Sequence, residues 1–133
     1  MRILLDTGCW LWSLTDPDRL NTRARELIAD PAQELFLSAA SSWEIAIKTA
    51  LGKLRLPEAP DRYVPRRMES MDIQGLPVEH AHALRVFSLP AHHRDPFDRI
   101  LIAQAQMESL AILTADPAFA AYDVETIWAA QSK

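Results

Sequence analysis

The chain has 133 residues, of which 49% are hydrophobic and 24% are charged, and its net charge is −4 at pH 7. This size and composition are typical of one globular domain with a buried core, so we expect residues 1–133 to form a single domain. The acidic balance argues against a protein that coats nucleic acid, because such proteins are normally basic. It does not exclude a nuclease whose acidic side chains are its active site.

The N-terminal apolar segment is too short for an export signal or a membrane span. Asp6 interrupts it, so neither a signal-peptide core nor a transmembrane helix is expected here. Cys9 is the single cysteine, which excludes an internal disulfide and fits a reducing compartment. These features predict a cytoplasmic protein that does not contact a membrane.

Short apolar runs alternate with helical segments along the chain. Strands are expected at Arg2–Leu5, Glu34–Ser38, Ile73–Leu76, 110–114 and 124–128. Helices are expected around Trp10, after a cap at Asn21 or Thr22, and at 41–51, 61–71, 78–88 and Pro96–Glu108. This alternation predicts an α/β fold with a parallel, doubly wound sheet.

Four carboxylates stand where a strand ends or a helix begins: Asp6, Glu44, Asp98 and Asp116. In a parallel sheet such junctions collect at the carboxyl edge, where ligands usually bind. Four acids at one edge repel each other, and their pKa values rise unless a cation neutralises them. Mg²⁺ or Mn²⁺, held by oxygen ligands, is the simplest neutraliser. A pocket of this kind is suited to cutting phosphodiesters.

The same acids also have structural explanations. Ser41 and Glu44 match a capping box, and Glu44 stands four residues before Lys48, a favourable helical ion pair. Asp95 and Asp116 each precede a proline and can cap the following helix. Capping alone does not require every acid to reach the same edge, so the joint pattern favours a site.

Four motifs resemble the PIN-domain family, and within it the VapC-type toxins of bacterial toxin–antitoxin pairs. The motifs are L-L-D-T at 4–7, S-W-E-I-A-I-K at 42–48, H-R-D-P-F-D-R-I-L-I-A-Q-A at 93–105 and L-T-A-D at 113–116. They follow the family's order over nearly the whole chain, and the third is the most specific. Gly8 is a departure, because many relatives carry a polar residue there. The resemblance implies a PIN-like α/β/α sandwich in which helices flank a short parallel central sheet.

The resemblance also implies the site and the activity. The implied catalytic quartet is Asp6, Glu44, Asp98 and Asp116. Asp6 and Asp98 would be the principal Mg²⁺ ligands, with Mn²⁺ as an alternative ion. Thr114 would support the quartet, and Asp95 would be either a further ligand or only a helix cap. The implied activity is endoribonuclease cleavage of single-stranded RNA, including loops of structured RNA, by a homodimer that a cognate antitoxin restrains.

Arg94 and Arg99 flank the third motif and are the first candidates for phosphate contacts, followed by Lys48. His92 and His93 lie in the loop before that motif, and we expect no zinc site there because convergent Cys/His spacing is absent from the sequence.

Trp10 and Trp12 are two apart on a short helix and cannot both point into one core, which suggests a partner surface. Two other functions stay open: another Mg²⁺-dependent phosphoesterase, and a non-catalytic PIN-like interaction module.

Overall fold

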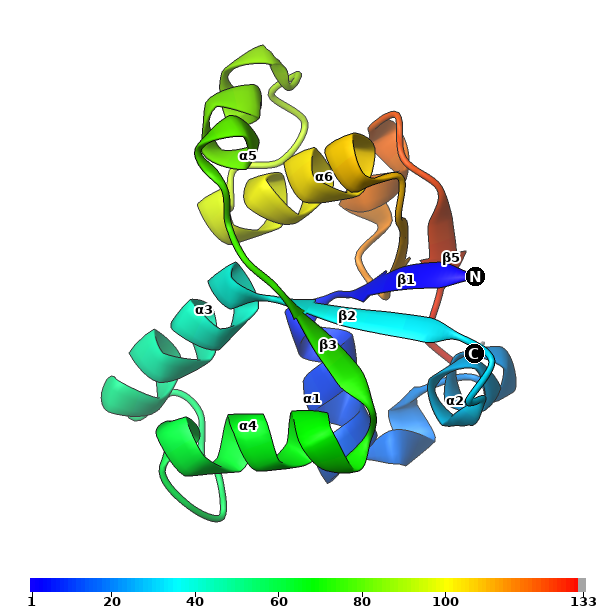
Figure 1. Ribbon diagram of the computed structural model, residues 1–133, viewed down its shortest axis with the longest axis vertical. Helices are drawn as coiled ribbons and strands as arrows, with labels where there is room; N and C mark the ends of the chain where they lie inside the picture. The colour runs from blue at the N-terminus through cyan, green and yellow to red at the C-terminus, as the bar shows by residue number, and fades with distance from the viewer. Residues whose placement is uncertain (132–133) are drawn as a thin grey trace.

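The computed structural model describes residues 1–131 and contains one five-stranded parallel sheet, with strand order β3-β2-β1-β4-β5 (Figure 1). The strands are β1 (Arg2–Leu5), β2 (Glu34–Ser38), β3 (Ile73–Leu76), β4 (Ala111–Thr114) and β5 (Thr126–Trp128). The first strand is central, and the chain winds outward from it in both directions. This order confirms the predicted α/β, doubly wound sheet.

Helices cover both faces of the sheet (Figure 1). The α-helices are α1 (Thr7–Thr15), α2 (Thr22–Ala29), α3 (Ala39–Ala50), α4 (Pro60–Ser70), α5 (His80–Arg85) and α6 (Pro96–Glu108). Three 3₁₀ segments were not expected: η1 (Pro17–Arg19), η2 (Val86–Ser88) and η3 (Pro117–Ala121). Among residues 1–131, no helix combines the length and the apolar character that crossing a bilayer requires.

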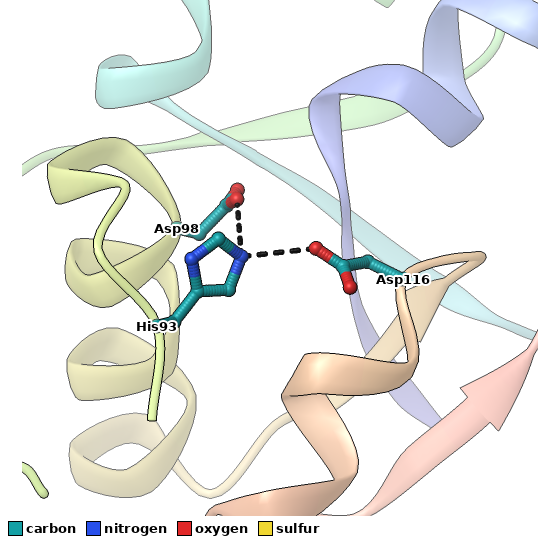
Figure 2. Close-up of side chains that lie close together, drawn as sticks. All are labelled: His93, Asp98 and Asp116. Atoms are coloured by element: carbon teal, nitrogen blue, oxygen red, sulfur yellow. Dashed lines mark hydrogen bonds and ion pairs between the residues drawn. The ribbon is translucent and has the colours of Figure 1, made fainter. Parts of the chain in front are cut away.

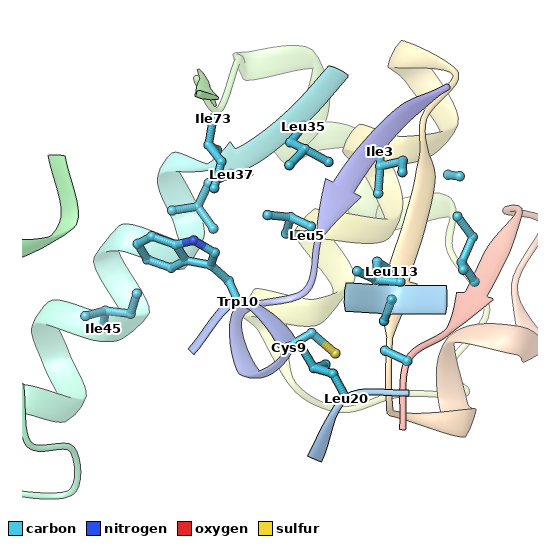
Figure 3. Close-up of a cluster of buried hydrophobic side chains, with 14 of the residues drawn as sticks. Ile3, Leu5, Cys9, Trp10, Leu20, Leu35, Leu37, Ile45, Ile73 and Leu113 are labelled. Carbon is cyan, nitrogen blue, oxygen red and sulfur yellow. The ribbon is translucent and has the colours of Figure 1, made fainter. Parts of the chain in front are cut away.

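Alternation along each strand divides the core into two layers. Ile3 and Leu5 point to the face covered by α1 to α4, where Trp10 is fully buried (Figure 3). Leu4 points to the opposite face, where α6 and η3 supply residues such as Ile102. Successive strand side chains face opposite sides of a sheet, so a strand buried on both faces reads as a continuous apolar run. The R-I-L-L sequence is such a run.

The beginning of α3 differs from the prediction. The helix begins at Ala39 and is capped by Ser38, whose hydroxyl accepts from the backbone N–H of Ala40, so the expected capping box at Ser41 is wrong. Ser41 instead accepts a buried 2.8 Å hydrogen bond from the Thr7 hydroxyl, which ties α3 to α1.

The predicted helix 78–88 is shorter than expected and ends in a different geometry. It begins at His80 and narrows to 3₁₀ after Arg85. His82 is buried in a capping box with Glu79, and its other ring nitrogen lies 3.0 Å from Glu108 of α6. This histidine has a structural role.

Neither tryptophan of α1 forms the exposed surface that the sequence suggested. Trp10 is in the core, and Trp12 is partly buried beneath the guanidinium of Arg19, 4.4 Å from the ring centre. Arg19 follows in η1, so a local turn covers Trp12.

Candidate active site

The carboxyl ends of β1 and β4 lie side by side at the centre of the sheet. Leu5 pairs with Leu113, and the backbone N–H of Asp6 donates to the carbonyl of Leu113 over 3.0 Å. The chain reverses its winding direction between these two strands. Such a switch point is the usual ligand position in an open α/β sheet. Asp6 and Asp116 reach it from the strand ends.

Thr114 links the two strand-end acids. Its hydroxyl donates a 2.7 Å hydrogen bond to Asp6 Oδ2 and accepts a 3.0 Å hydrogen bond from the backbone N–H of Asp116. Thr114 is 1% exposed, so few water molecules can substitute for it. One hydroxyl therefore fixes both the side chain of Asp6 and the backbone that carries Asp116.

His93 lies between Asp98 and Asp116 (Figure 2). Its Nε2 is 2.9 Å from Asp98 Oδ2 and 2.9 Å from Asp116 Oδ2. Its Nδ1 accepts from the backbone N–H of Asp95 over 3.2 Å, which places the ring proton on Nε2. His93 therefore donates toward both carboxylates and holds them close together.

The loop that carries His93 is fixed by contacts distant in sequence. The Tyr122 hydroxyl accepts from the backbone N–H of His93 at 2.8 Å and donates to the carbonyl of Pro90 at 2.9 Å. The guanidinium of Arg99 donates to four carbonyls around the loop, those of Val86, Leu89, Pro90 and His93. These contacts hold His93 at the acids.

The acids of the site disfavour one another's charge. Burial raises the pKa of Asp98 to about 8, and the negative charges of Asp6, Asp95, Glu44 and Asp116 act in the same direction. Burial also raises the pKa of Asp6, although the hydrogen bond from Thr114 opposes the rise. The site therefore attracts either protons or a cation.

Glu44 is the most buried carboxylate of the set and is only half satisfied. It is 6% exposed, and its Oε2 accepts a 2.6 Å hydrogen bond from Lys48 Nζ. Its Oε1 is buried without a hydrogen-bond partner among the described residues. Buried oxygens of this kind normally have a partner, so the atom is available to a ligand that carries positive charge or a proton.

A divalent ion fits this arrangement. His93, Asp98 and Asp116 each offer a ligand atom within 4.8 Å of the others. The oxygen-rich set suits Mg²⁺ or Mn²⁺. Because Nε2 of His93 carries the proton, this ring is a donor to the acids and not a ready metal ligand. Asp98, Asp6 and the free oxygen of Glu44 are the better candidates to hold an ion.

A model of the PIN domain matches residues 3–125. The chain belongs to the PIN-domain family. It is also 48% identical over 58 residues to Ribonuclease VapC16 of Mycobacterium tuberculosis, a stretch that covers 44% of this chain and 41% of that protein. The matched stretch is therefore less than half the length of that relative.

Solved structures share the PIN fold over nearly the full chain. VapBC2 from Rickettsia felis, bound to a DNA fragment from its promoter, superposes with a TM-score of 0.73 at 12% identity, covering 97% of this chain and 99% of that one. A toxin-antitoxin complex from Klebsiella pneumoniae gives a TM-score of 0.64 at 17% identity, covering 94% and 95%. At these identities the likeness concerns the fold, and it agrees with the expected PIN-like sandwich.

Within this PIN domain the structure places the predicted acids and Thr114 as follows. The four acids and Thr114 lie near one another at one edge, although Glu44 stands in the second turn of α3 and not where that helix begins. Asp95 caps α6, because its Oδ1 accepts from the backbone N–H of Phe97 over 2.9 Å. Asp116 likewise caps η3 through the backbone N–H of Ala118, also at 2.9 Å, while its second oxygen faces His93. Capping and a place in the site are therefore compatible.

The predicted phosphate contacts need a correction. Arg99 is occupied by loop carbonyls and by the Tyr122 hydroxyl, so it organises the loop and does not face solvent freely. Lys48 is bound to Glu44 but half-exposed. Arg94 is exposed, and within residues 1–131 it forms no ion pair. Arg94 and Lys48 therefore remain the candidates.

His93 is the residue that the sequence interpretation missed. It was assigned to a loop without a role, whereas the structure brings it between two acids. One signal was available in the sequence. His93 stands two residues before Asp95, the cap of a helix whose N-terminus reaches the carboxyl edge.

Proposed function

We propose that this PIN domain is a metal-dependent endoribonuclease toxin that cleaves single-stranded RNA and is neutralised by a cognate antitoxin. The observation that carries the proposal is the acid cluster at the switch point, in which the pKa of Asp98 is raised to about 8 and Glu44 keeps an unpartnered buried oxygen. Two comparisons support the proposal: one relative is a ribonuclease, and one structural neighbour is a toxin-antitoxin complex.

The proposed cofactor is Mg²⁺, with Mn²⁺ as an alternative. Asp6 and Asp98 would hold the ion. The free Oε1 of Glu44 and Oδ2 of Asp116, the oxygen that faces His93, would complete or orient the ligands around it. When bound, a divalent ion supplies Lewis-acid stabilisation of phosphate charge and lowers the pKa of water. This chemistry needs no 2′-hydroxyl of the RNA, and the products would carry 5′-phosphate and 3′-hydroxyl ends.

The side chains have distinct proposed roles. Glu44 would orient a water molecule or take its proton; in support, Lys48 binds one of its oxygens and the other has no partner among the described residues. Thr114 is a positioning residue, because it acts through Asp6. Lys48 and Arg94 would contact the RNA backbone, which compensates locally for an acidic surface.

Protein partners are part of the proposal. The chain would form a homodimer and bind an antitoxin. The 3₁₀ segment η2 and the helix α5 before it expose large apolar side chains, with Phe87 at 96% and Leu84 at 74% exposed. Exposed apolar residues that lie together mark protein contact surfaces, so this region is the first candidate for such a contact.

A map of new RNA 5′-phosphate ends after brief expression of the protein in cells tests the proposal. A parallel culture expresses Asp98→Asn at the same level. A small set of sites unique to the unsubstituted protein would support the ribonuclease function and name its target. No difference between cultures, with both proteins folded and free of antitoxin, would favour a non-catalytic interaction module or a phosphoesterase with another substrate.

A further inference from the structure

An aromatic pair with one exposed member, Trp43, lies beside the acid cluster. Trp43 of α3 and Phe97 of α6 meet edge to face, with ring centres 5.1 Å apart and ring planes at 73°. Trp43 is 60% exposed, and Phe97 is partly buried. Each aromatic residue directly precedes an acid of the site, Glu44 in one helix and Asp98 in the other. The pair therefore spans the two helices that carry these acids.

Packing does not explain the presence of Trp43 at this position. Trp10 is fully buried and fills the core, whereas most of the Trp43 ring faces solvent. A single exposed apolar residue is common on a protein surface. A tryptophan that pairs with a second aromatic ring beside a cluster of acids presents a flat apolar surface next to reactive groups.

A positive charge accompanies the aromatic pair. Lys48 lies one helical turn after Glu44 on α3, and its side chain is half-exposed. Its Nζ donates to Glu44 Oε2 over 2.6 Å, and a lysine ammonium is charged at neutral pH. Aromatic surface and cation thus occur together on one stretch of α3.

We propose that Trp43 and Phe97 form a stacking surface for one base of the single-stranded RNA, with Lys48 contacting a neighbouring phosphate. The proposal rests on the ribonuclease function above and specifies how the substrate is held. Proteins that bind single-stranded RNA combine aromatic rings, which stack on bases of any identity, with cations along the backbone. A base stacked here would bring an adjacent phosphate to Glu44 and Asp98.

A protein partner is the competing occupant, and the surface favours RNA. Each ring belongs to a residue next to an acid that would act on the phosphate, and Lys48, on the same helix as Trp43, supplies a cation suited to a nucleic-acid backbone. Apolar side chains with a greater exposed fraction are available to a protein partner on α5 and η2, at Leu84 and Phe87.

Binding of RNA without cleavage tests the proposal. A short fluorescein-labelled single-stranded RNA pool of randomised sequence is titrated with the full chain carrying Asp98→Asn, and fluorescence anisotropy is measured. The same background then receives Trp43→Ala, Trp43→Phe or, as a control, Leu51→Ala. Leu51 is 63% exposed at the opposite end of α3, so it matches Trp43 in exposure. Thermal melting verifies that each variant folds.

Trp43→Ala should weaken RNA binding roughly 5- to 150-fold, the range that corresponds to loss of one stacked base. Trp43→Phe should retain most of the affinity, and Leu51→Ala all of it. Equal affinity of Trp43→Ala and its background overturns the proposal, as does failure of the background itself to bind. If Trp43→Ala changes the oligomeric state of the protein in solution and leaves its RNA affinity unchanged, the proposal is overturned in favour of self-association.

Cleavage separates this proposal from the function on which it rests. The chain with Asp98 intact is incubated with the same RNA pool and Mg²⁺ or Mn²⁺. Cleavage together with unchanged binding by Trp43→Ala overturns only the stacking surface. Absence of cleavage counts against the ribonuclease itself.

Discussion

Thr114 Oγ1 lies 2.7 Å from Asp6 Oδ2, so a threonine at the end of β4 determines the orientation of the carboxylate at the end of β1. The same oxygen accepts from the backbone N–H of Asp116. One buried hydroxyl thus connects two acids that are 110 residues apart in the chain. This relationship makes Thr114 the best test of positioning within the site.

Thr114→Val should reduce RNA cleavage and stability together. Valine keeps the shape but leaves Asp6 Oδ2 and the N–H of Asp116 without their partner, which costs about 1–3 kcal/mol. Thr114→Ser keeps the hydroxyl and should restore most of the activity. Thermal melting and cleavage rates measure both effects. A valine variant as active as the unsubstituted chain would exclude the positioning role.

His93→Ala should lower the stability of the metal-free protein by about 1–3 kcal/mol, since it removes a donor from two carboxylates and leaves them to repel each other. The variant should then gain more stability from saturating Mg²⁺ or Mn²⁺ than the unsubstituted chain does, because no ring proton has to leave the acids. Melting with chelator and with ion gives both values.

His80→Ala is the matched control for this experiment. His80 is exposed and begins α5, outside the acid cluster. If His93→Ala instead gained less stability from the ion than the unsubstituted chain, His93 would be a ligand and its assignment as a donor would be wrong.

Much of the fold was predictable because its signals are local. Strands β1, β2 and β3 and helix α6 have the predicted bounds. The first two strands contain short apolar runs, and α6 has a proline directly after its cap. The cap of α3 was predicted wrongly, although the strand before it was expected to end at Ser38. Ser38 and Ser41 are both good caps, and the end of β2 at Ser38 decides between them.

Asp6, Asp98 and Asp116 were predictable for the same reason, because a strand end and a helix start marked by proline are local features. His93 was not. Its position depends on a loop that Arg99 and Tyr122 hold, and Tyr122 stands 29 residues further along the chain. The sequence pattern instead assigned Arg99 to RNA, since its charge is visible in the sequence and its carbonyl partners are not.

Arg99 and Arg94 therefore offer a contrasting pair of substitutions. Arg99→Ala should destabilise the protein by about 2–4 kcal/mol, because it leaves several loop carbonyls without donors. Arg99→Lys should restore little of this stability, since an ammonium cannot reproduce the planar fork. Arg94→Ala should leave the melting temperature unchanged and weaken RNA binding, with a shallower salt dependence.

Urea unfolding and RNA binding at several salt concentrations distinguish the two arginines. If Arg99→Ala melted like the unsubstituted chain and lost RNA affinity, the original assignment of Arg99 to phosphate would be restored.

The raised pKa of Asp98 predicts how stability depends on pH. In the unfolded chain this carboxyl ionises near its ordinary value of 3.8, whereas in the fold it ionises at about 8. Between these values the folded state binds the proton more tightly, so the metal-free protein loses stability as pH rises from about 4 to about 8. Above that range the contribution of Asp98 no longer changes.

Asp98→Asn should therefore stabilise the metal-free protein at pH 8 by more than about 1 kcal/mol, since one pKa unit corresponds to about 1.4 kcal/mol. The advantage should shrink toward pH 4, where the aspartate is neutral in the folded state and close to half-protonated in the unfolded one. Mg²⁺ at pH 8 should raise the melting temperature of the unsubstituted chain and have little effect on the asparagine variant. Asp123→Asn, at an exposed position, is the control. A stability difference between the unsubstituted chain and the Asp98→Asn variant that stayed constant from pH 4 to pH 8 would contradict the raised pKa, because only a titrating carboxylate makes that difference depend on pH.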